Sequence, residues 1–158
     1  MSNPYELPKD LLHEVIVRTI EFDNISNEII RTAFGLEIEW GGENESIPTN
    51  LNEINRFNKF FLENLGSSSR AELLLNVVED ICKTNKEEVA KCKDFKNKLI
   101  NFYKIRNIFA HNIYPKDLQG FTRLESSEPH WNILAKQHEE LFNELEEFLM
   151  NICYKKID

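Results

Sequence analysis

The sequence has 158 residues, of which 41% are hydrophobic and 29% are charged, a composition typical of one globular domain and not of a disordered chain. No run of about 18 apolar residues is present, so we expect no transmembrane helix and no membrane partner. The net charge of −8 argues against general nucleic-acid binding over the whole surface.

The first predicted helix starts after Pro8 and runs to about Phe34, with apolar residues recurring at helical spacing. The stretch MSNPYELPKD before and at its start lacks the basic and apolar regions of a secretory signal, so we expect a cytoplasmic protein. Within the helix, FDNIS at 22–26 is a candidate break, because Asp, Asn and Ser favour caps and turns. Residues 35–50 hold three glycines and one proline and predict a loop, with Trp40 as a lip over a site.

A second helix is predicted over about 50–65. A third, strongly apolar helix follows a capping box formed by Ser69 and Glu72. A fourth helix is predicted over about 86–110. The last begins near Pro129, with Ser126 or Ser127 as its cap. These segments predict an all-α, up-down bundle of four to five helices that forms one domain over residues 1–158.

Charge is unevenly distributed along the chain. The window from Lys83 to Lys116 holds nine basic and three acidic residues, a net charge of +6, which leaves −14 for the remainder. An anion such as a phosphate backbone is attracted to this window and repelled elsewhere. The alternative is that the lysines form an ordinary solvated helix face.

The segment YKIRNIFAHN, residues 103–112, places Arg106, Asn107 and His111 in the predicted fourth helix. At 100° per residue, Arg106 falls on the predicted core face, where it would need an anion, several acceptors or a cleft. That face carries Cys92, Phe95, Leu99, Phe102, Phe109 and Ala110. A structural reading pairs Arg106 with a carboxylate from another helix, such as one of the glutamates at 139–147.

Asn107 and His111 fall on a different face of the same helix, with Lys93, Ile100 and Lys104. On a straight helix Arg106 and His111 point about 140° apart, so they cannot easily meet on one substrate atom. A shared site requires that the helix unwinds near His111 or that two copies face each other about a two-fold axis.

The pattern Arg106-Asn107-x-x-x-His111 resembles the Arg-x(4–6)-His signature of the HEPN superfamily, which lies late in a helix of an α-helical bundle. The segment FYKIRNIFAH is also similar to a segment of mannitol-repressor-like proteins, and FFLENLGSSSRAELLL to the region upstream of it there. The resemblance implies metal-independent RNA cleavage by a homodimer formed through this helix, without a cofactor. The resemblance also implies a toxin or a phage-defence protein, and therefore an antitoxin protein as a further partner. The alternative is a non-catalytic interaction or regulatory protein like the mannitol-repressor-like proteins, in which Arg106 and His111 are structural.

The resemblance also implies a role for each motif residue. His111 would transfer a proton, Arg106 would stabilise charge on the phosphoryl oxygens, and Asn107 would orient a neighbour or a phosphate oxygen. Lys93 and Lys104 are the candidate contacts to the RNA backbone. Some HEPN toxins carry a modified tyrosine two residues after the histidine, but Tyr114 lies one residue farther on, which departs from that pattern. Tyr114 is therefore a candidate RNA contact, with packing as its alternative.

For the remaining candidate residues, the sequence indicates structural roles and no catalytic or metal-binding role. His138 lies on the apolar stripe of the last helix and is predicted to be a satisfied core or interface histidine. The three cysteines, Cys82, Cys92 and Cys153, are widely spaced and predict reduced thiols. No cluster of His, Cys or carboxylates has ligand spacing, so no metal site is predicted.

Overall fold

The computed structural model describes residues 7–43, 46–83, 86–111 and 131–154. It contains five α-helices: α1 (Lys9–Ala33), α2 (Leu51–Phe60), α3 (Ser67–Cys82), α4 (Lys86–His111) and α5 (Trp131–Phe148). The 3-10 turn η1 (Leu62–Asn64) follows α2, and the π-helical stretch η2 (Leu149–Tyr154) extends α5. No strand occurs within these described ranges, and the predicted all-α bundle is confirmed.

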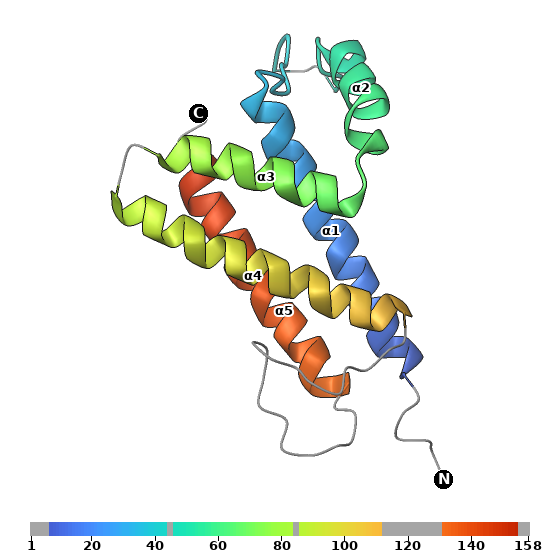
Figure 1. Cartoon of the computed structure of the whole chain (residues 1–158). Helices are drawn as coiled ribbons and strands as arrows, with labels where there is room; N and C mark the ends of the chain where they lie inside the picture. The colour runs from blue at the N-terminus through green and yellow to red at the C-terminus, as the bar shows by residue number, and fades with distance from the viewer. Residues whose placement is uncertain (1–6, 44–45, 84–85, 112–130, 155–158) are drawn as a thin grey trace.

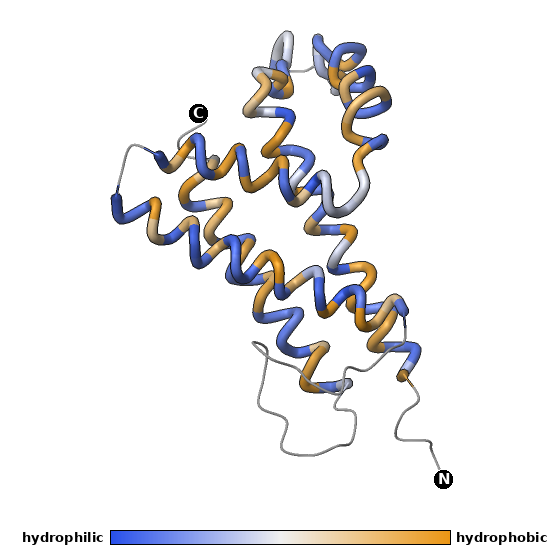
Figure 2. Tube along the Cα trace, viewed as in Figure 1, coloured by the Kyte–Doolittle hydropathy of each residue, from blue (hydrophilic) through white to orange (hydrophobic). Residues whose placement is uncertain are grey.

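Helices α1, α3, α4 and α5 pack against one another, whereas α2 stands at one end of the molecule beside the end of α1 (Figure 1). Helix α1 contacts each of the other three helices of the bundle, and α4 lies between α3 and α5. Figure 2 shows apolar and polar residues interleaved along the helices, as expected when one side of each helix is buried. In the described part of the chain, no helix combines the length and apolarity needed to cross a membrane.

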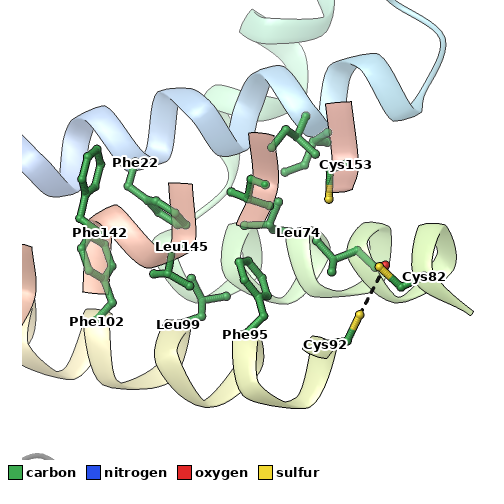
Figure 3. Close-up of a cluster of buried hydrophobic side chains, with 14 of the residues drawn as sticks. Phe22, Leu74, Cys82, Cys92, Phe95, Leu99, Phe102, Phe142, Leu145 and Cys153 are labelled. Carbon is green, nitrogen blue, oxygen red and sulfur yellow. Dashed lines mark hydrogen bonds between the residues drawn. The ribbon is translucent and has the colours of Figure 1, made fainter. Parts of the chain in front are cut away.

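The main hydrophobic cluster occupies the middle of the bundle (Figure 3). The rings of Phe22 and Phe102 lie 5.0 Å apart, and those of Phe95 and Phe148 stack at 4.7 Å. All three cysteines are buried in this cluster and none is in a disulfide, and the Cys92 thiol donates to the Val78 carbonyl oxygen at 4.0 Å. Burial raises the pKa of Cys92 to about 12, so its thiol stays protonated and poorly nucleophilic.

A second cluster lies where the C-terminal end of α4 meets the beginnings of α1 and α5. The rings of Phe109 and Trp131 lie 5.2 Å apart within it. Its buried members are Val15, Ile105, Phe109, Trp131, Leu134 and Ala135. The last two turns of α4, which carry the Arg-Asn-His motif, are therefore anchored by a cluster separate from the main core.

Helix α1 passes through the FDNIS stretch without a break, so that candidate break was wrong. Ser26 is buried, and its hydroxyl donates to the Phe22 carbonyl oxygen at 2.9 Å, which satisfies it inside the helix. The helix ends at Ala33, one residue before the predicted end at about Phe34, and is followed by Gly35, whose φ of 82° suits glycine. There Gly35 N donates to Thr32 O and Leu36 N to Arg31 O, the two hydrogen bonds of a Schellman motif.

The predicted capping box at Ser69 was also wrong. Helix α3 begins at Ser67 after Gly66, without a side-chain cap, and Arg70 N donates to Gly66 O. The Arg70 guanidinium then donates to the Leu62 and Leu65 carbonyl oxygens at 3.1 and 3.2 Å. Tertiary hydrogen bonds from Arg70, and not a local box, therefore hold the turn before α3.

Candidate functional site

The buried stripe of α4 drifts around the helix, and this drift decides where Arg106 lies. The buried residues recur slightly more often than every 3.6 positions, because the first half of α4 packs into the main cluster and the second half into the other. They are Cys92, Phe95, Leu99, Phe102, Ile105 and Phe109. Ile105 thus takes the core position predicted for Arg106, and Ala110 is exposed. The prediction that Arg106 and Ala110 lie on the core face was wrong.

Arg106 is half-buried at the edge of this stripe. Its Nη1 donates to Oδ1 of Asn107 at 2.9 Å. It makes no ion pair with any carboxylate of the described residues, so the predicted structural pairing with a glutamate of α5 is not formed there. Glu139 instead pairs with Arg18, and Glu144 with Lys98. Among the described residues, the one hydrogen bond of this guanidinium runs to Asn107 and none runs to a carboxylate.

Asn107 and His111 are both exposed, four residues apart on one side of α4. The lysines predicted to accompany them, Lys93 and Lys104, are exposed on that side as well. We call this surface the outer face of α4, and it comprises Lys93, Lys96, Ile100, Lys104, Asn107 and His111. Tyr114 lies outside the described residues.

Helix α4 remains α-helical through His111, so unwinding does not bring the motif residues together. Five residues of straight helix separate Arg106 from His111 by about 140° around the axis and about 7.5 Å along it. Within one chain the structure joins Arg106 to Asn107, and Asn107 shares the outer face with His111. It does not direct Arg106 and His111 at one point.

Tyr103 ties the motif end of α4 to α1. Its hydroxyl donates to Oδ1 of Asp23 at 2.5 Å, and burial raises the pKa of the phenol, so the group remains a donor. Arg70 completes the cluster, with Nη1 at 3.8 Å from Asp23 and Nε donating to Asn27 at 2.9 Å. This cluster could not be predicted from the sequence, because its members come from α1, α3 and α4 and share no local spacing.

A second arginine–histidine pair lies between α1 and α5. His138 is fully buried and stacks on Phe102 with ring centroids 4.1 Å apart, which agrees with the predicted core histidine. Arg18 lies 3.0 Å from its Nδ1 through Nη1, and Thr19 lies 3.1 Å from its Nε2 through Oγ1. Arg18 is only 8% exposed and pairs with Glu14 and Glu139 at its outer end. Neither Arg18 nor Thr19 carried a signal in the sequence.

The hydrogen bonds of this pair determine the state of the imidazole. Arg18 can only donate, so Nδ1 of His138 must accept and the proton must sit on Nε2. Nε2–H then donates to Thr19, whose own hydroxyl proton goes to the Val15 carbonyl oxygen at 2.8 Å. Burial, together with the Arg18 charge, lowers the pKa of His138 to about 3. His138 is thus held neutral and is a structural residue, not a proton donor near neutral pH.

An open groove of about 540 Å³ runs between α1 and α5 beside this pair. Its wall is acidic, with four carboxylates against the guanidinium of Arg18 and the imidazole of His13. Those carboxylates belong to Asp10, Glu14, Glu21 and Glu139. None of the motif residues lines it, and its charge is opposite to the charge that an RNA backbone needs.

Trp40 does not form a lip over the motif, and that prediction was wrong. Its loop follows the C-terminal end of α1, whereas the motif end of α4 packs near Val15, about 19 helical residues or ~28 Å away along α1. Among the described residues, no three His, Cys, Asp or Glu side chains are grouped so that they could hold a metal ion.

Comparison with family models, with curated proteins and with solved structures gave no match to this chain.

Proposed function

We propose that this protein is a HEPN-type, metal-independent endoribonuclease that acts as a homodimer. The observation that carries the proposal is the position of the motif on the last two turns of α4. Asn107 and His111 are exposed there on the outer face of α4, and the half-buried Arg106 is bonded to Asn107. A structural arginine would instead be buried against a carboxylate, which would favour the non-catalytic alternative.

The chemistry uses a ribose 2′-hydroxyl as the nucleophile. Its oxygen attacks the adjacent phosphorus and the bond from phosphorus to O5′ breaks, which leaves a 2′,3′-cyclic phosphate and a 5′-hydroxyl. His111 takes the 2′ proton, and water gives a proton to O5′. Arg106 stabilises the charge on the phosphoryl oxygens, and Asn107 orients its guanidinium through the 2.9 Å hydrogen bond.

The angular separation of Arg106 and His111 favours a site shared by two copies. Because α4 is helical to its end, Arg106 of one chain would act with His111 of the other across a two-fold axis. The exposed lysines of two outer faces repel each other in the absence of a polyanion, and an RNA strand between them removes that repulsion. RNA binding and pairing of the outer faces therefore support each other.

The test measures cleavage of a labelled single-stranded RNA in buffer with EDTA. His111→Ala and Arg106→Ala should each reduce the rate by about 10²–10⁴-fold, because each removes a group that acts in the transition state. His13→Ala is the matched control, since His13 is an exposed histidine on α1. A 2′-deoxy substrate should resist cleavage. If the wild type and His111→Ala cleave RNA equally, or if neither cleaves it, the proposal is wrong.

Mixing the two inactive variants tests the shared site directly. In a dimer of one Arg106→Ala copy and one His111→Ala copy, one composite site lacks both groups and the other is intact. Random pairing should therefore restore about one quarter of the wild-type rate. A mixture that stays inactive, from variants that still form mixed dimers, would rule out a site built from both chains.

A further inference from the structure

The groove between α1 and α5 combines carboxylates with apolar side chains. Leu11, Val17 and Phe142 line it together with the four carboxylates named above. On α1, three of these carboxylates and one apolar residue recur every three or four positions, so they form one stripe along the helix. We call it the acidic stripe, and its members, all exposed, are Asp10, Glu14, Val17 and Glu21. An open groove bordered by such a stripe can receive the side chains of a helix from a second molecule.

The acidic charge of this groove is only partly neutralised within the chain. Arg18 pairs with Glu14 at 3.3 Å and with Glu139 at 3.5 Å. Asp10 and Glu21, at the two ends of the acidic stripe, form no ion pair among the described residues. The groove therefore attracts a cationic surface and repels RNA and anionic lipid.

The outer face of α4 carries a pattern complementary to the acidic stripe. On α1, Val17 lies seven positions after Asp10 and four before Glu21. On α4, an exposed isoleucine has the same spacing to an exposed lysine on each side, and these residues are Lys93, Ile100 and Lys104. The two charges at the ends lie eleven residues apart on both helices, or ~16 Å along the axis. Opposite charges at equal spacing, with an apolar residue at the same place between them, allow the two helices to pack side by side.

The apolar residues favour one direction for this packing. A parallel alignment opposes unlike charges at both ends and the two apolar residues between them, in the pairs Asp10–Lys93, Val17–Ile100 and Glu21–Lys104. An antiparallel alignment also opposes unlike charges at the ends, but it sets Glu14 against Ile100. Val17 is 45% exposed and Ile100 is 41% exposed, so the parallel contact removes apolar surface of both residues from water.

Local charge decides whether two copies attract each other here. Each copy has a net charge of −8, but charges farther apart than ~8 Å are screened at physiological ionic strength. At the contact itself, an acidic groove meets the outer face of α4, which belongs to the sequence window with a net charge of +6. Two outer faces repel each other when no RNA is present, whereas the groove attracts an outer face under the same conditions.

We propose that, in the absence of RNA, the groove between α1 and α5 of one copy binds the outer face of α4 of a second copy. The contact covers the lysines of the outer face and keeps both RNA and another outer face away from it. The groove and the outer face share no residue, so the assembly is head-to-tail. The contact itself is independent of RNA cleavage, and its inhibitory effect rests on the proposed function.

The first test is the average mass, measured by light scattering over a range of protein concentrations without RNA. Glu21→Lys and Lys104→Glu should each weaken association by about tenfold or more, because each sets like charges against each other in the contact. Glu53→Lys and Lys59→Glu are the matched controls, since they make the same changes of charge at exposed positions of α2. All four variants should keep the wild-type circular dichroism spectrum. A wild type that stays monomeric, or a Glu21→Lys variant that associates like the wild type, overturns the proposal.

Mixing the two variants tests whether the partner is the same chain. The altered groove of Glu21→Lys then meets the altered outer face of Lys104→Glu, so unlike charges are opposed again. The mixture should recover the association of the wild type, although neither variant associates as strongly alone. Weakening without recovery would overturn the self-association and indicate another occupant of the groove, such as a basic segment of a different protein.

The inhibitory effect is tested in the RNA cleavage assay at low and high protein concentration. Wild type and Glu21→Lys should cleave equally at concentrations where the wild type is dissociated, because Glu21 lies outside the motif. At concentrations where the wild type associates, Glu21→Lys should cleave faster per molecule. Equal rates there would overturn the inhibition. If no protein cleaves RNA at any concentration, the proposed function fails, while the mass measurements still decide the contact.

Discussion

Arg18 and Arg106 belong to the same bundle, and each has a histidine nearby in the fold or along the chain, but their surroundings differ. Arg18 is almost fully buried, reaches the buried His138 and pairs with two glutamates. Arg106 is half-buried, bonds its neighbour Asn107 and lies on the same helix as the exposed His111. In the first pair, both terminal nitrogens of the arginine and both ring nitrogens of the histidine have partners within this chain. The second pair is not joined by a hydrogen bond among the described residues, and its histidine is exposed.

The largest expected effect compares the two arginines in stability. Arg18→Met should lower the free energy of unfolding by about 2–4 kcal/mol, because His138 loses its donor inside the core. Arg106→Met should change it by no more than about 0.5 kcal/mol, as is usual for a surface substitution. Urea denaturation followed by circular dichroism measures both. Equal losses for the two variants would show that Arg106 is also a structural residue.

The two histidines should differ in their effect on stability as pH falls. His138 has a pKa of about 3 in the folded protein, so between that pH and about 6.5 only the unfolded chain binds the proton. Unfolding thus becomes easier as pH falls, by about 2 kcal/mol between pH 6.5 and 5, before most carboxylates titrate.

Denaturation at several pH values measures this slope for variants of each histidine. His138→Phe should be less stable throughout but should lose the extra slope, whereas His111→Ala should keep the wild-type slope. A wild-type stability that is flat over this range would contradict a neutral His138.

A smaller effect is expected at Tyr103, which stands between the two regions. Tyr103→Phe removes the hydrogen bond to Asp23 and should cost about 1–2 kcal/mol, because the bond joins a half-buried phenol to a carboxylate. Asn107→Ala, one turn farther along α4, should cost less than about 0.5 kcal/mol. Thermal denaturation measures the loss of stability in both variants. A larger loss for Asn107→Ala than for Tyr103→Phe would show that the motif has the structural role.

The smallest effect concerns the lysines of the outer face of α4. Lys93→Ala and Lys104→Ala should each lower the slope of log affinity against log salt for single-stranded RNA by about 0.7, the value for one phosphate contact. Lys59→Ala, on α2, is the control and should leave the slope unchanged. Fluorescence anisotropy at several salt concentrations measures it. The same slope in all variants would exclude the outer face as the RNA surface.

Most of the fold could be predicted from the sequence because helical periodicity and the few prolines and glycines are local signals. The ends of α1 at Pro8 and Gly35 follow from those two residues. The start of α3 could not be predicted from local residues. Arg70 donates to the carbonyl oxygens of Leu62 and Leu65, and the helix begins at Ser67, before the predicted cap at Ser69.

The candidate site was predicted in part. Asn107 and His111 were placed on one face with Lys93 and Lys104, and this depends only on the geometry of one helix. The predicted position of Arg106 on the core face was wrong. A spacing of 100° per residue assumes that the buried stripe runs straight along the helix, whereas α4 packs into two clusters. The contact between Arg18 and His138 joins residues 120 positions apart, and no local pattern encodes which helices will meet.

The second cluster has a consequence for the order in which the chain is made. Ile105 and Phe109 are buried against Val15 and against Trp131, Leu134 and Ala135. The last three residues leave the ribosome after the whole of α4, since synthesis proceeds from the N-terminus. Until they emerge, Ile105 and Phe109 at the motif end of α4 cannot be buried against them. A chain that stalls before Trp131 would therefore expose a site for chaperones, and its Arg106 and His111 would not yet be held in place.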